Sequence, residues 1–514
     1  MGKHFSVSRL FLCGAISAVF LAVAGNSRAQ DDLGDPPVAP AAEANGQAVL
    51  SSRNFVTRTV TGVGTTASSP WIDISTRETV RSYYLDQYEA SNGVAIQWTG
   101  SLSGNPGHSA TGSAGTTSTA YKQAVIARIN WFRAMAGVPA VIALDNNYSA
   151  QDQKAALMMA ANNQLNHAPP TSWLLYSSAG ANAAGNSNLA LGKVGPAAIT
   201  AYIDDYGNNG AAGHRRWIIY PQTQNMGTGD IPRVTTFAPA NATWVVDENY
   251  GTTRPATRDG YVAWPPPGYV PYELVFPRWS FSYPDADFSN ASVTMTHNGN
   301  PVAVALETVD EGYGENTLVW AWNGIDPTTT TASMDKPASD TTYEVNLTGV
   351  KIGGATQSFS YDVTVFDPNT VIPAYQADLW IADWGKADWV GNDIYNTTAA
   401  DQNLSQPLLA GKTRNFKIKL QNDGNVPDTF TLTGSAAGTG FKVAYFDGGK
   451  NVTAAVAAGT YQVKLKAGGT RVLMLRIAAG KTLASGTAQD CLFTAQSKND
   501  RSKADTVEAT VTVP

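Results

Sequence analysis

The hydrophobic period of the chain changes near residue 237, and this change constrains the fold more than any other feature. Between residues 119 and 235, apolar side chains recur every three to four positions, which is typical of amphipathic helices. Beyond about residue 237, apolar and polar residues alternate as they do in half-buried strands. We therefore predict an α+β chain in which a helical domain precedes all-β domains.

The length of 514 residues is too great for one hydrophobic core, so we expect several domains. The segment after the N-terminus is rich in Pro and Ala over 31–46 and reads as a disordered linker, and no function follows from residues 47–115. The predicted division is a signal peptide at 1–29, a linker and poorly assigned segment at 30–115, a helical domain at 116–236, a β-sandwich at 237–370 and a C-terminal β-sandwich at 374–514.

The first 29 residues have the pattern of a secretory signal peptide. Lys3 and Arg9 give a positive start, an apolar run follows over 10–24, and small residues flank Arg28. The run is too short for a membrane anchor, and no second apolar span follows. We expect a protein that is secreted or held in the cell envelope, with no transmembrane span in the mature chain.

Cysteine content excludes a disulfide-linked chain, and the charge pattern excludes a nucleic-acid-binding protein. Removal of the leader leaves Cys491 as the single cysteine, so an intrachain disulfide cannot form, and its neighbours Leu492 and Phe493 predict a buried strand position. The net charge is -6 and no basic block interrupts the chain. Nucleic acid is therefore an unsuitable partner, because phosphate binding requires clustered Lys and Arg.

Helix signals divide the region from 119 to 235 into short elements. A first helix begins near Thr119 and ends at Gly137, which is followed by Pro139. We place a second helix from Ser149 to His167, where two prolines follow. A third helix opens with Pro196 and ends at Gly207, and a short helix or turn covers 213–220.

Strand signals fill the rest of the chain. Residues 292–304 read as a hairpin with an Asn298-Gly299 turn. Regular spacing and Gly-rich turns after residue 374 favour a β-sandwich of the immunoglobulin-like kind. The other predicted strands are 342–347, 359–365, 416–420, 430–432, 441–446, 461–465 and 472–477.

Two histidines in the helical region are the first candidates for chemistry. The chain has 5 His, and His167 and His214 each lie beside a predicted helix end. Either residue has a structural interpretation: His167 can donate to the free carbonyls of its helix, and His214 can be a buried residue bonded to backbone. The alternative is that both rings line one shared cleft.

The order and spacing of four blocks in residues 119–235 resemble the CAP superfamily, which includes cysteine-rich secretory proteins and plant pathogenesis-related proteins. The blocks are Ile129-Asn130-Trp131-Phe132-Arg133 with Gly137-Val138-Pro139, Leu144-Asp145 with residues 155–167, Ser187-Asn188-Leu189-Ala190, and residues 201–205 leading to Gly213-His214-Arg215-Arg216. The resemblance covers less than a quarter of the chain. It implies an α-β-α sandwich with a cleft.

In many family members that cleft holds two histidines and two acidic residues that can bind zinc. Carried over by position, the histidines are His167 and His214, the first acid is replaced by Ser187, and the second is Asp205. No Glu lies between Glu89 and Glu248, so no glutamate can take the missing role. The resemblance further implies Asn188 and Arg215 as cleft residues. His167, Asp205 and His214 are therefore the candidate catalytic residues, and the two histidines are the candidate metal ligands.

The missing carboxylate makes the site less suited to metal binding and to acid–base catalysis. Two imidazoles and one carboxylate can still hold a divalent metal such as zinc with water in the open position. They make a poorer general acid and base, because one group must take a proton while another gives one. A Ser187, His214 and Asp205 triad lacks the strained Gly-X-Ser-X-Gly turn. The Arg215-Arg216 pair can contact an anionic ligand at the cleft rim, or one Arg can pair with Asp204 while the other faces solvent.

Aromatic clusters offer a second type of binding surface. Trp264 and Trp279 follow the helical domain, and Trp380, Trp384 and Trp389 open the last domain. Exposed Trp rings can stack on sugars, which makes a glycan a candidate partner. Their irregular spacing favours core or interdomain packing instead.

Three functions remain open from the sequence. The first, which we favour, is a non-catalytic extracellular protein that binds a small ligand, a lipid or a cell-surface component in the two-histidine cleft, with the β-sandwiches as spacer or adhesion modules. The second is a divalent-metal-dependent hydrolase that uses His167, Asp205 and His214. The third is a structural envelope or matrix protein.

Overall fold

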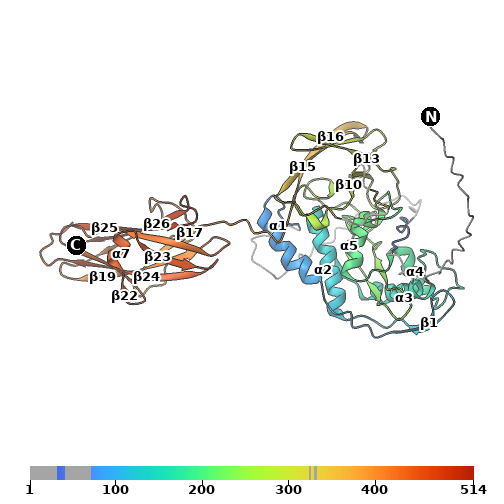
Figure 1. The fold of residues 1–514 in the computed structure, drawn as a ribbon, viewed down its shortest axis with the longest axis horizontal. Coiled ribbons are helices and arrows are strands. Elements are labelled where there is room, and N and C mark those ends of the chain that lie inside the picture. Colours follow the sequence, from blue (N-terminus) through green and yellow to red (C-terminus); the bar gives the residue numbers. More distant parts are fainter. Residues whose placement is uncertain (1–31, 41–70, 323–325, 329–332) are drawn as a thin grey trace, which may run out of the picture. The chain divides into compact units, whose positions relative to one another are not determined.

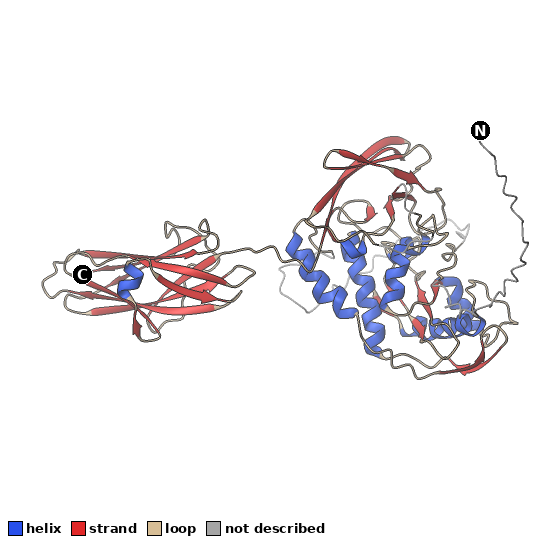
Figure 2. Ribbon diagram, in the orientation of Figure 1, coloured by secondary structure: helices blue, strands red, loops and turns tan. Residues whose placement is uncertain are grey.

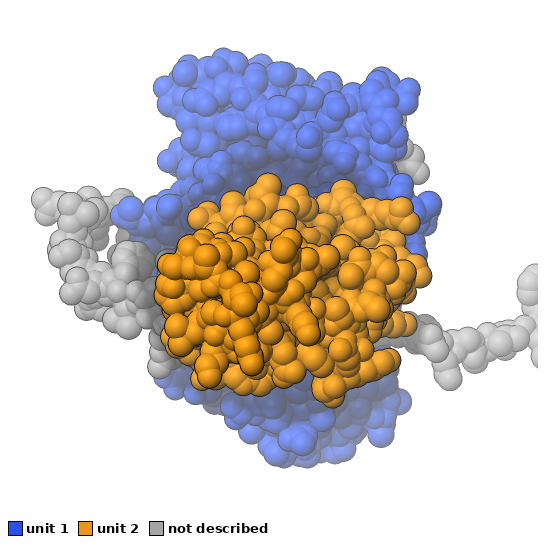
Figure 3. Space-filling model, turned by 90° about the vertical axis from the view of Figure 1, so that its left-hand side faces the viewer, with its two compact units in different colours: residues 1–369 blue, residues 370–514 orange. Residues whose placement is uncertain are grey.

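The computed structural model describes residues 32–40, 71–322, 326–328 and 333–514. The predicted signal peptide lies outside these residues, as do residues 31 and 41–46 of the predicted linker. The chain forms two compact units, Met1–Asn369 and Thr370–Pro514, coloured separately in Figure 3. Helices belong almost entirely to the first unit, and the second is built of strands with one short helix (Figure 2).

The described part of the first unit opens with helical turns and a hairpin. Helix α1 (Arg77–Tyr83) runs on through the helical turns Tyr84–Tyr88 and Glu89–Ser91. Strands β1 (Ser101–Asn105) and β2 (Ser109–Ser113) then pair antiparallel. Small residues over 101–113 give no hydrophobic alternation that would mark these strands in the sequence. Cross-strand hydroxyl contacts such as Ser101 Oγ to Ser113 Oγ, at 3.2 Å, accompany the backbone ladder.

Helix α2 (Thr119–Ala136) has the predicted bounds. Ser118 Oγ accepts a hydrogen bond from Tyr121 N, and Gly137 ends the helix at φ 77°. The helix packs against the turns after α1 and against α5 (Figure 1). Trp131 fills that contact, with its ring 4.9 Å from the ring of Tyr88.

Helix α3 (Asn146–Asn162) differs from its prediction at both ends. Asp145, rather than Ser149, caps the start, because its carboxylate accepts from the backbone N–H groups of residues 147 and 148. Asn163 ends the helix at φ 49°. His167 therefore lies in the following loop and not at the helix terminus.

Three shorter helices complete the helical layer. They are α4 (Ser178–Asn186), α5 (Pro196–Asp204) and α6 (Gly213–Ile218). The sequence did not predict α4, whose Ala, Gly and Asn residues show no apolar stripe. Helix α5 ends earlier than expected, because Asp205, two residues before Gly207, already takes the left-handed conformation, at φ 55°.

A small sheet lies within this helical region. Its order is β4-β7-β6, built from β4 (Ser187–Leu191), β7 (Ala240–Trp244) and β6 (Gly229–Ile231), and β3 (Ala143–Leu144) pairs separately with β5 (Asn225–Met226). Strand β7 follows residue 237 yet pairs with β4 along its full length. The boundary predicted at residue 236 therefore falls inside the sheet of the helical domain.

The rest of the first unit is a sandwich of two mainly antiparallel sheets, in orders β13-β14-β10-β8 and β12-β11-β15-β16-β9. The predicted hairpin is present as β11 and β12. Residues from both sheets share one core, including Trp279, Trp320 and Val345. The strands are β8 (Val262–Trp264), β9 (Gly268–Pro271), β10 (Arg278–Ser282), β11 (Ser292–His297), β12 (Asn300–Val302), β13 (Val304–Leu306), β14 (Thr317–Trp322), β15 (Thr341–Ile352) and β16 (Ala355–Phe366).

The second unit is a further pair of sheets, in orders β17-β19-β24-β21-β22 and β18-β26-β25-β20-β23. Cys491 is buried in β25 within this core, as expected for a small apolar residue. The elements are β17 (Ala377–Asp383), β18 (Asn403–Pro407), β19 (Thr413–Asn422), β20 (Asp428–Gly434), β21 (Phe441–Asp447), β22 (Lys450–Asn451), α7 (Thr453–Ala457), β23 (Tyr461–Leu465), β24 (Thr470–Ala479), β25 (Ala488–Ser497) and β26 (Ala504–Thr512).

Buried arginines join the helical domain to the first sandwich. Arg278 on β10 donates to the backbone oxygens of Asp205 and Gly207, at 2.5 and 2.8 Å. From the other side, Arg215 Nη1 donates to Ser280 Oγ at 3.0 Å. Asp204 lies beside these cations, and its burial raises its pKa to about 7 although Arg215 opposes the shift.

Arg133 joins separate segments inside the helical domain in a similar way. Its fully buried guanidinium donates to the carbonyl oxygens of Pro139, Ile218 and Tyr220, at 2.9, 2.9 and 2.8 Å.

We expect Arg133→Met to lower the free energy of unfolding of the first unit by about 3–5 kcal/mol, because several buried carbonyls lose their donor. Urea unfolding measures this, with the exposed Lys154→Met as a control that shifts stability little. Equal effects of the two variants would contradict the assignment.

Asp204 makes the stability of the first unit depend on pH. The folded pKa of about 7 exceeds the ordinary value of 3.8, so between pH 4 and 7 the unfolded chain loses a proton that the folded chain retains. Stability contributed by this group is therefore full below pH 4 and lost by pH 7. We expect Asp204→Asn to match the wild type near pH 4 and to exceed it by about 1–4 kcal/mol at pH 8. Thermal unfolding at both pH values tests this, and a gain that is independent of pH would refute it.

Candidate functional site

His214 is held in α6 by a carboxylate. Its Nδ1 lies 2.8 Å from Asp205 Oδ1, and both side chains are fully buried. The left-handed backbone of Asp205 turns its carboxylate toward the start of α6, where its second oxygen accepts from Arg215 N at 3.1 Å. The carboxylate fixes the ring proton on Nδ1. The other nitrogen, Nε2, is buried and has no hydrogen-bond partner among the described residues.

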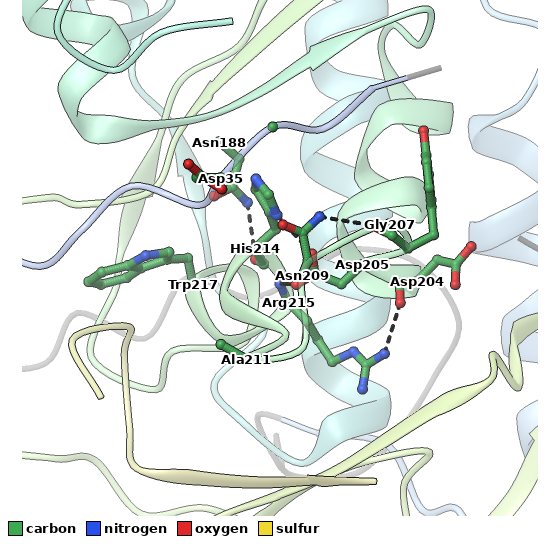
Figure 4. A network of polar contacts seen from close by, with 12 residues as sticks. Asp35, Asn188, Asp204, Asp205, Gly207, Asn209, Ala211, His214, Arg215 and Trp217 are labelled. Carbon is green, nitrogen blue, oxygen red and sulfur yellow. Dashed lines mark hydrogen bonds and ion pairs between the residues drawn. The ribbon is translucent and has the colours of Figure 1, made fainter. Parts of the chain in front are cut away.

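His167 contacts two backbone carbonyls. Its Nδ1 lies 2.6 Å from Ala184 O, and its Nε2 lies 2.7 Å from Asp35 O. Burial lowers the pKa of His167, and the nearby His214 lowers that pKa further. A neutral imidazole has one N–H, so it can donate to only one of these two oxygens. Asp35, whose backbone oxygen faces His167, lies next to Asn188 and His214 in Figure 4, so both histidines border the same segment.

Ser187 faces a carboxylate that the sequence reasoning missed. Its hydroxyl donates to Asp152 Oδ1 at 2.8 Å, and Asp152 Oδ2 accepts from Trp244 N. Burial raises the pKa of Asp152 well above its usual value. The proton of Ser187 is thus directed at α3 and not at His214. Asp152 could have been singled out as an acid placed among the apolar residues of a predicted helix stripe.

Asn188 lies beside His214 and positions α6. Its Nδ2 donates to the backbone oxygen of His214 at 3.0 Å, as Figure 4 shows. Its Oδ1 is buried without a partner among the described residues. Asn188 Oδ1 and His214 Nε2 are both acceptors, so two unsatisfied buried acceptors belong to residues in contact with each other.

The two arginines after His214 are not at a cleft rim. Arg215 is fully buried and donates to the carbonyls of Ile203 and Asp204 as well as to Ser280. Arg216 is also buried, and its guanidinium donates to the backbone oxygen of Glu315. The structure therefore differs from both expectations for this pair, because neither Arg faces solvent and neither guanidinium is free for an anion.

Residues 32–40 run across the histidine pair. Besides the contact of Asp35 O with His167, Pro37 O accepts from Trp217 Nε1 at 2.7 Å. Figure 4 shows Asp35 on this segment next to Asn188 and His214, with Trp217 close by. The sequence predicts a disordered linker for these residues, because Pro, Gly and Asp carry no periodic signal.

The residues around the histidines do not fit a resident zinc ion. Asp205 is engaged by His214 Nδ1 and Arg215 N, Ser187 is not a carboxylate, and His167 Nε2 faces a carbonyl. A catalytic zinc site needs three protein ligands. Across the described residues, the single group of three or more His, Cys, Asp or Glu with ligand atoms within 4.8 Å is Asp378, Asp393 and Asp423 in the second unit.

The tryptophans divide between core and surface. Trp264 and Trp279 are fully buried in the first unit. In the second unit, Trp384 is 53% exposed, whereas Trp380 is half-buried beneath Lys419, whose Nζ lies 2.8 Å from the ring centroid. Packing therefore accounts for the first pair, and Trp384 presents an open aromatic surface.

Comparison with known proteins identifies one region of the chain. Residues 126–233 match the model of the CAP family, described as the cysteine-rich secretory protein family. No curated protein matches the chain at a significant level. Within the described residues, every helix is too short or too polar to cross a bilayer.

Several solved structures align with parts of the chain. A family 123 glycoside hydrolase from Clostridium perfringens aligns at 10% identity and TM-score 0.20, covering 27% of this chain and 27% of its own. Cadherin-like domains 1 to 4 of zebrafish RET align at 12% and 0.14, covering 44% and 41%. The major pilin subunit BcpA of Bacillus cereus aligns at 13% and 0.18, covering 43% and 64%.

This chain spans less than two thirds of each of these three proteins, and TM-scores this low support no functional argument. The family model and the geometry carry the identification instead. The predicted resemblance is confirmed: residues 126–233 form a CAP domain, and mainly antiparallel β-sheets follow it.

Proposed function

We propose that this chain is an exported, non-catalytic binding protein whose CAP domain takes a polar ligand beside His167 and His214. The observation that carries the proposal is the pair of buried acceptors, His214 Nε2 and Asn188 Oδ1, that have no partner among the described residues. Leaving such atoms unsatisfied costs about 1–3 kcal/mol each. A ligand with hydroxyl or N–H donors recovers that free energy.

The arrangement of the acids supports binding over catalysis. Asp205 is committed to His214 and to the backbone of Arg215, and Asp152 is committed to Ser187 and Trp244. Catalysis by acid and base requires one group that accepts a proton and another that donates it to the same substrate. Ser187 also lacks the contact with His214 that an activated nucleophile needs, since its hydroxyl is bonded to Asp152.

The β-sandwiches suit a spacer or adhesion role outside the cell, and an immunoglobulin-like architecture fits their paired sheets. Exposed Trp384 in the second unit is a candidate surface for a glycan. The match to a family described as secretory supports export, together with the signal pattern at the N-terminus. The ligand classes that fit are a small hydroxylated molecule, a lipid head group or a cell-surface component.

A metal-dependent hydrolase is the second candidate, and one observation favours it. Asp205 holds His214 through Nδ1 and leaves Nε2 free, which is how carboxylates orient histidines that bind metals. His167 and His214 would then supply two ligands, while Asp205 is already bonded to His214 and to Arg215 N.

The binding proposal predicts capture without turnover. We expect the purified chain to retain a hydroxylated small molecule or lipid from a defined mixture, measured by mass spectrometry after washing. His214→Phe and Asn188→Leu each lower retention by about tenfold, because each removes one acceptor. His108→Ala changes an exposed histidine between β1 and β2, serves as the control and leaves retention unchanged. Hydrolysis of peptides, esters or glycans that disappears in both His167→Ala and His214→Ala would overturn the proposal.

The metal candidate predicts a separate result. We expect calorimetry at pH 7 to detect no tight zinc site formed by His167 and His214, because only two ligand nitrogens are present. Any zinc binding should therefore be the same in His167→Ala and His214→Ala as in the wild type. The opposite outcome is well defined. A tight site that both variants abolish and that weakens in mild acid would establish the histidines as ligands, since imidazole must be deprotonated to coordinate.

A further inference from the structure

The segment 32–40, which we call the strap, is held in place like a bound peptide. Asp32 forms an antiparallel bridge with Leu191 at the open edge of β4, with N···O distances of 3.0 and 2.8 Å. This is the geometry by which an extended peptide adds a strand to a sheet edge. The next residue, Leu33, is 1% exposed and belongs to the main core of the unit.

The middle of the strap contacts the domain through its backbone oxygens. His167 Nε2 faces Asp35 O, and Trp217 Nε1 donates to Pro37 O. Pro36 between them is buried against Gly213, where an added Cβ would lie 2.5 Å from Pro36 Cγ. Ala39 N then donates to Gly312 O at 2.8 Å, which ends the docked stretch. The groove therefore provides a strand edge, two ring nitrogens and a glycine that admits a proline ring.

We propose that this groove is a binding site for an extended peptide, and that the strap is its resident, exchangeable occupant. The proposal rests on the proposed function, because it names the ligand class of the same site and what covers it. While the strap is docked, it occupies His167 Nε2 and lies beside Asn188 and His214 (Figure 4). A second peptide reaches these residues only when the strap leaves.

Three features make the strap exchangeable. Its contact with His167 competes with Ala184 for a single ring proton whenever the imidazole is neutral. Pro36 and Pro37 have no N–H, so the strap cannot donate there to the acceptors His214 Nε2 and Asn188 Oδ1. Its outer face is also open, with Val38 67% exposed. An incoming peptide that has N–H groups in place of the two prolines makes bonds that the strap lacks.

Variants within the full chain test this without removing any segment. Leu33→Asp places a carboxylate in the core position of the strap and leaves the groove intact, whereas Val38→Asp changes an exposed residue of the same strap. The probe is a fluorescent peptide with the sequence of residues 32–40, and anisotropy measures its binding. We expect Leu33→Asp to bind the probe at least about tenfold more tightly than the wild type, because its groove is free, and Val38→Asp to match the wild type.

Hydrogen exchange reports whether the strap has been released. Protection of the Asp32 and Ala39 amides is expected to fall in Leu33→Asp and to persist in Val38→Asp. A folded Leu33→Asp chain that loses this protection but does not bind the probe would overturn the proposal, as would unchanged protection. If Leu33→Asp does not fold, excess unlabelled probe added to the wild type provides the second measurement. Accelerated exchange of the strap amides supports the proposal, and unaltered exchange refutes it.

Two further arms define the site and separate it from the proposed function. Adding Trp217→Phe to Leu33→Asp removes the Nε1 donor and should weaken probe binding about tenfold, whereas Trp244→Phe removes an indole donor bonded to Val246 O at 2.7 Å and should not. A probe with Ala at both proline positions should bind more tightly, and weaker binding would contradict the role of the two acceptors. If the probe binds while the histidine variants retain small molecules unchanged, the proposed function fails and the peptide groove remains.

Discussion

The arrangement around the two histidines depends on the carboxylate of Asp205. It accepts from Arg215 N and faces His214 Nδ1, so one side chain fixes both the start of α6 and the tautomer of its histidine. The same residue presents its backbone oxygen to Arg278 on β10. A left-handed backbone at the end of α5 makes both possible, and Asp tolerates that conformation better than most residues. The turn thus connects the CAP domain, its candidate site and the sandwich that follows.

Three of the buried arginines provide a second constraint, and they donate to neutral oxygens and not to carboxylates. Arg133, Arg215 and Arg216 donate mainly to main-chain oxygens at helix ends and loops. Such oxygens lack partners in irregular backbone, and a guanidinium can satisfy several at once. This explains why a pattern of adjacent basic residues did not mark an anion site. From the sequence alone, an Arg that ties loops together is indistinguishable from one that meets a ligand.

Local signals identified the regular elements and missed long-range partners. Helix α2 was predicted with both ends because Gly137 stops it, and the β11–β12 hairpin because Asn298-Gly299 fits its turn. The start of α3 was misplaced because Ser149 and Asp145 are both plausible caps and only geometry selects one. The histidines and Asp205 were nominated by the family pattern, yet the bond between Ser187 and Asp152 joins residues 35 positions apart and leaves no local trace. The boundary at residue 236 failed similarly, since β7 pairs with a strand that precedes it by some fifty residues.

The strap shows most clearly why amino-acid composition alone does not predict whether a segment is ordered. Its Pro, Gly and Asp residues predict an unstructured linker, and by themselves they have no core to form. Order comes from the groove, which supplies a strand edge to Asp32, a core position to Leu33 and a donor to Pro37. Two consecutive prolines restrict the free segment to extended conformations and so lower the entropy lost on docking. The same prolines withhold the N–H groups that buried acceptors require, and a segment of this kind can therefore fill a site without satisfying it.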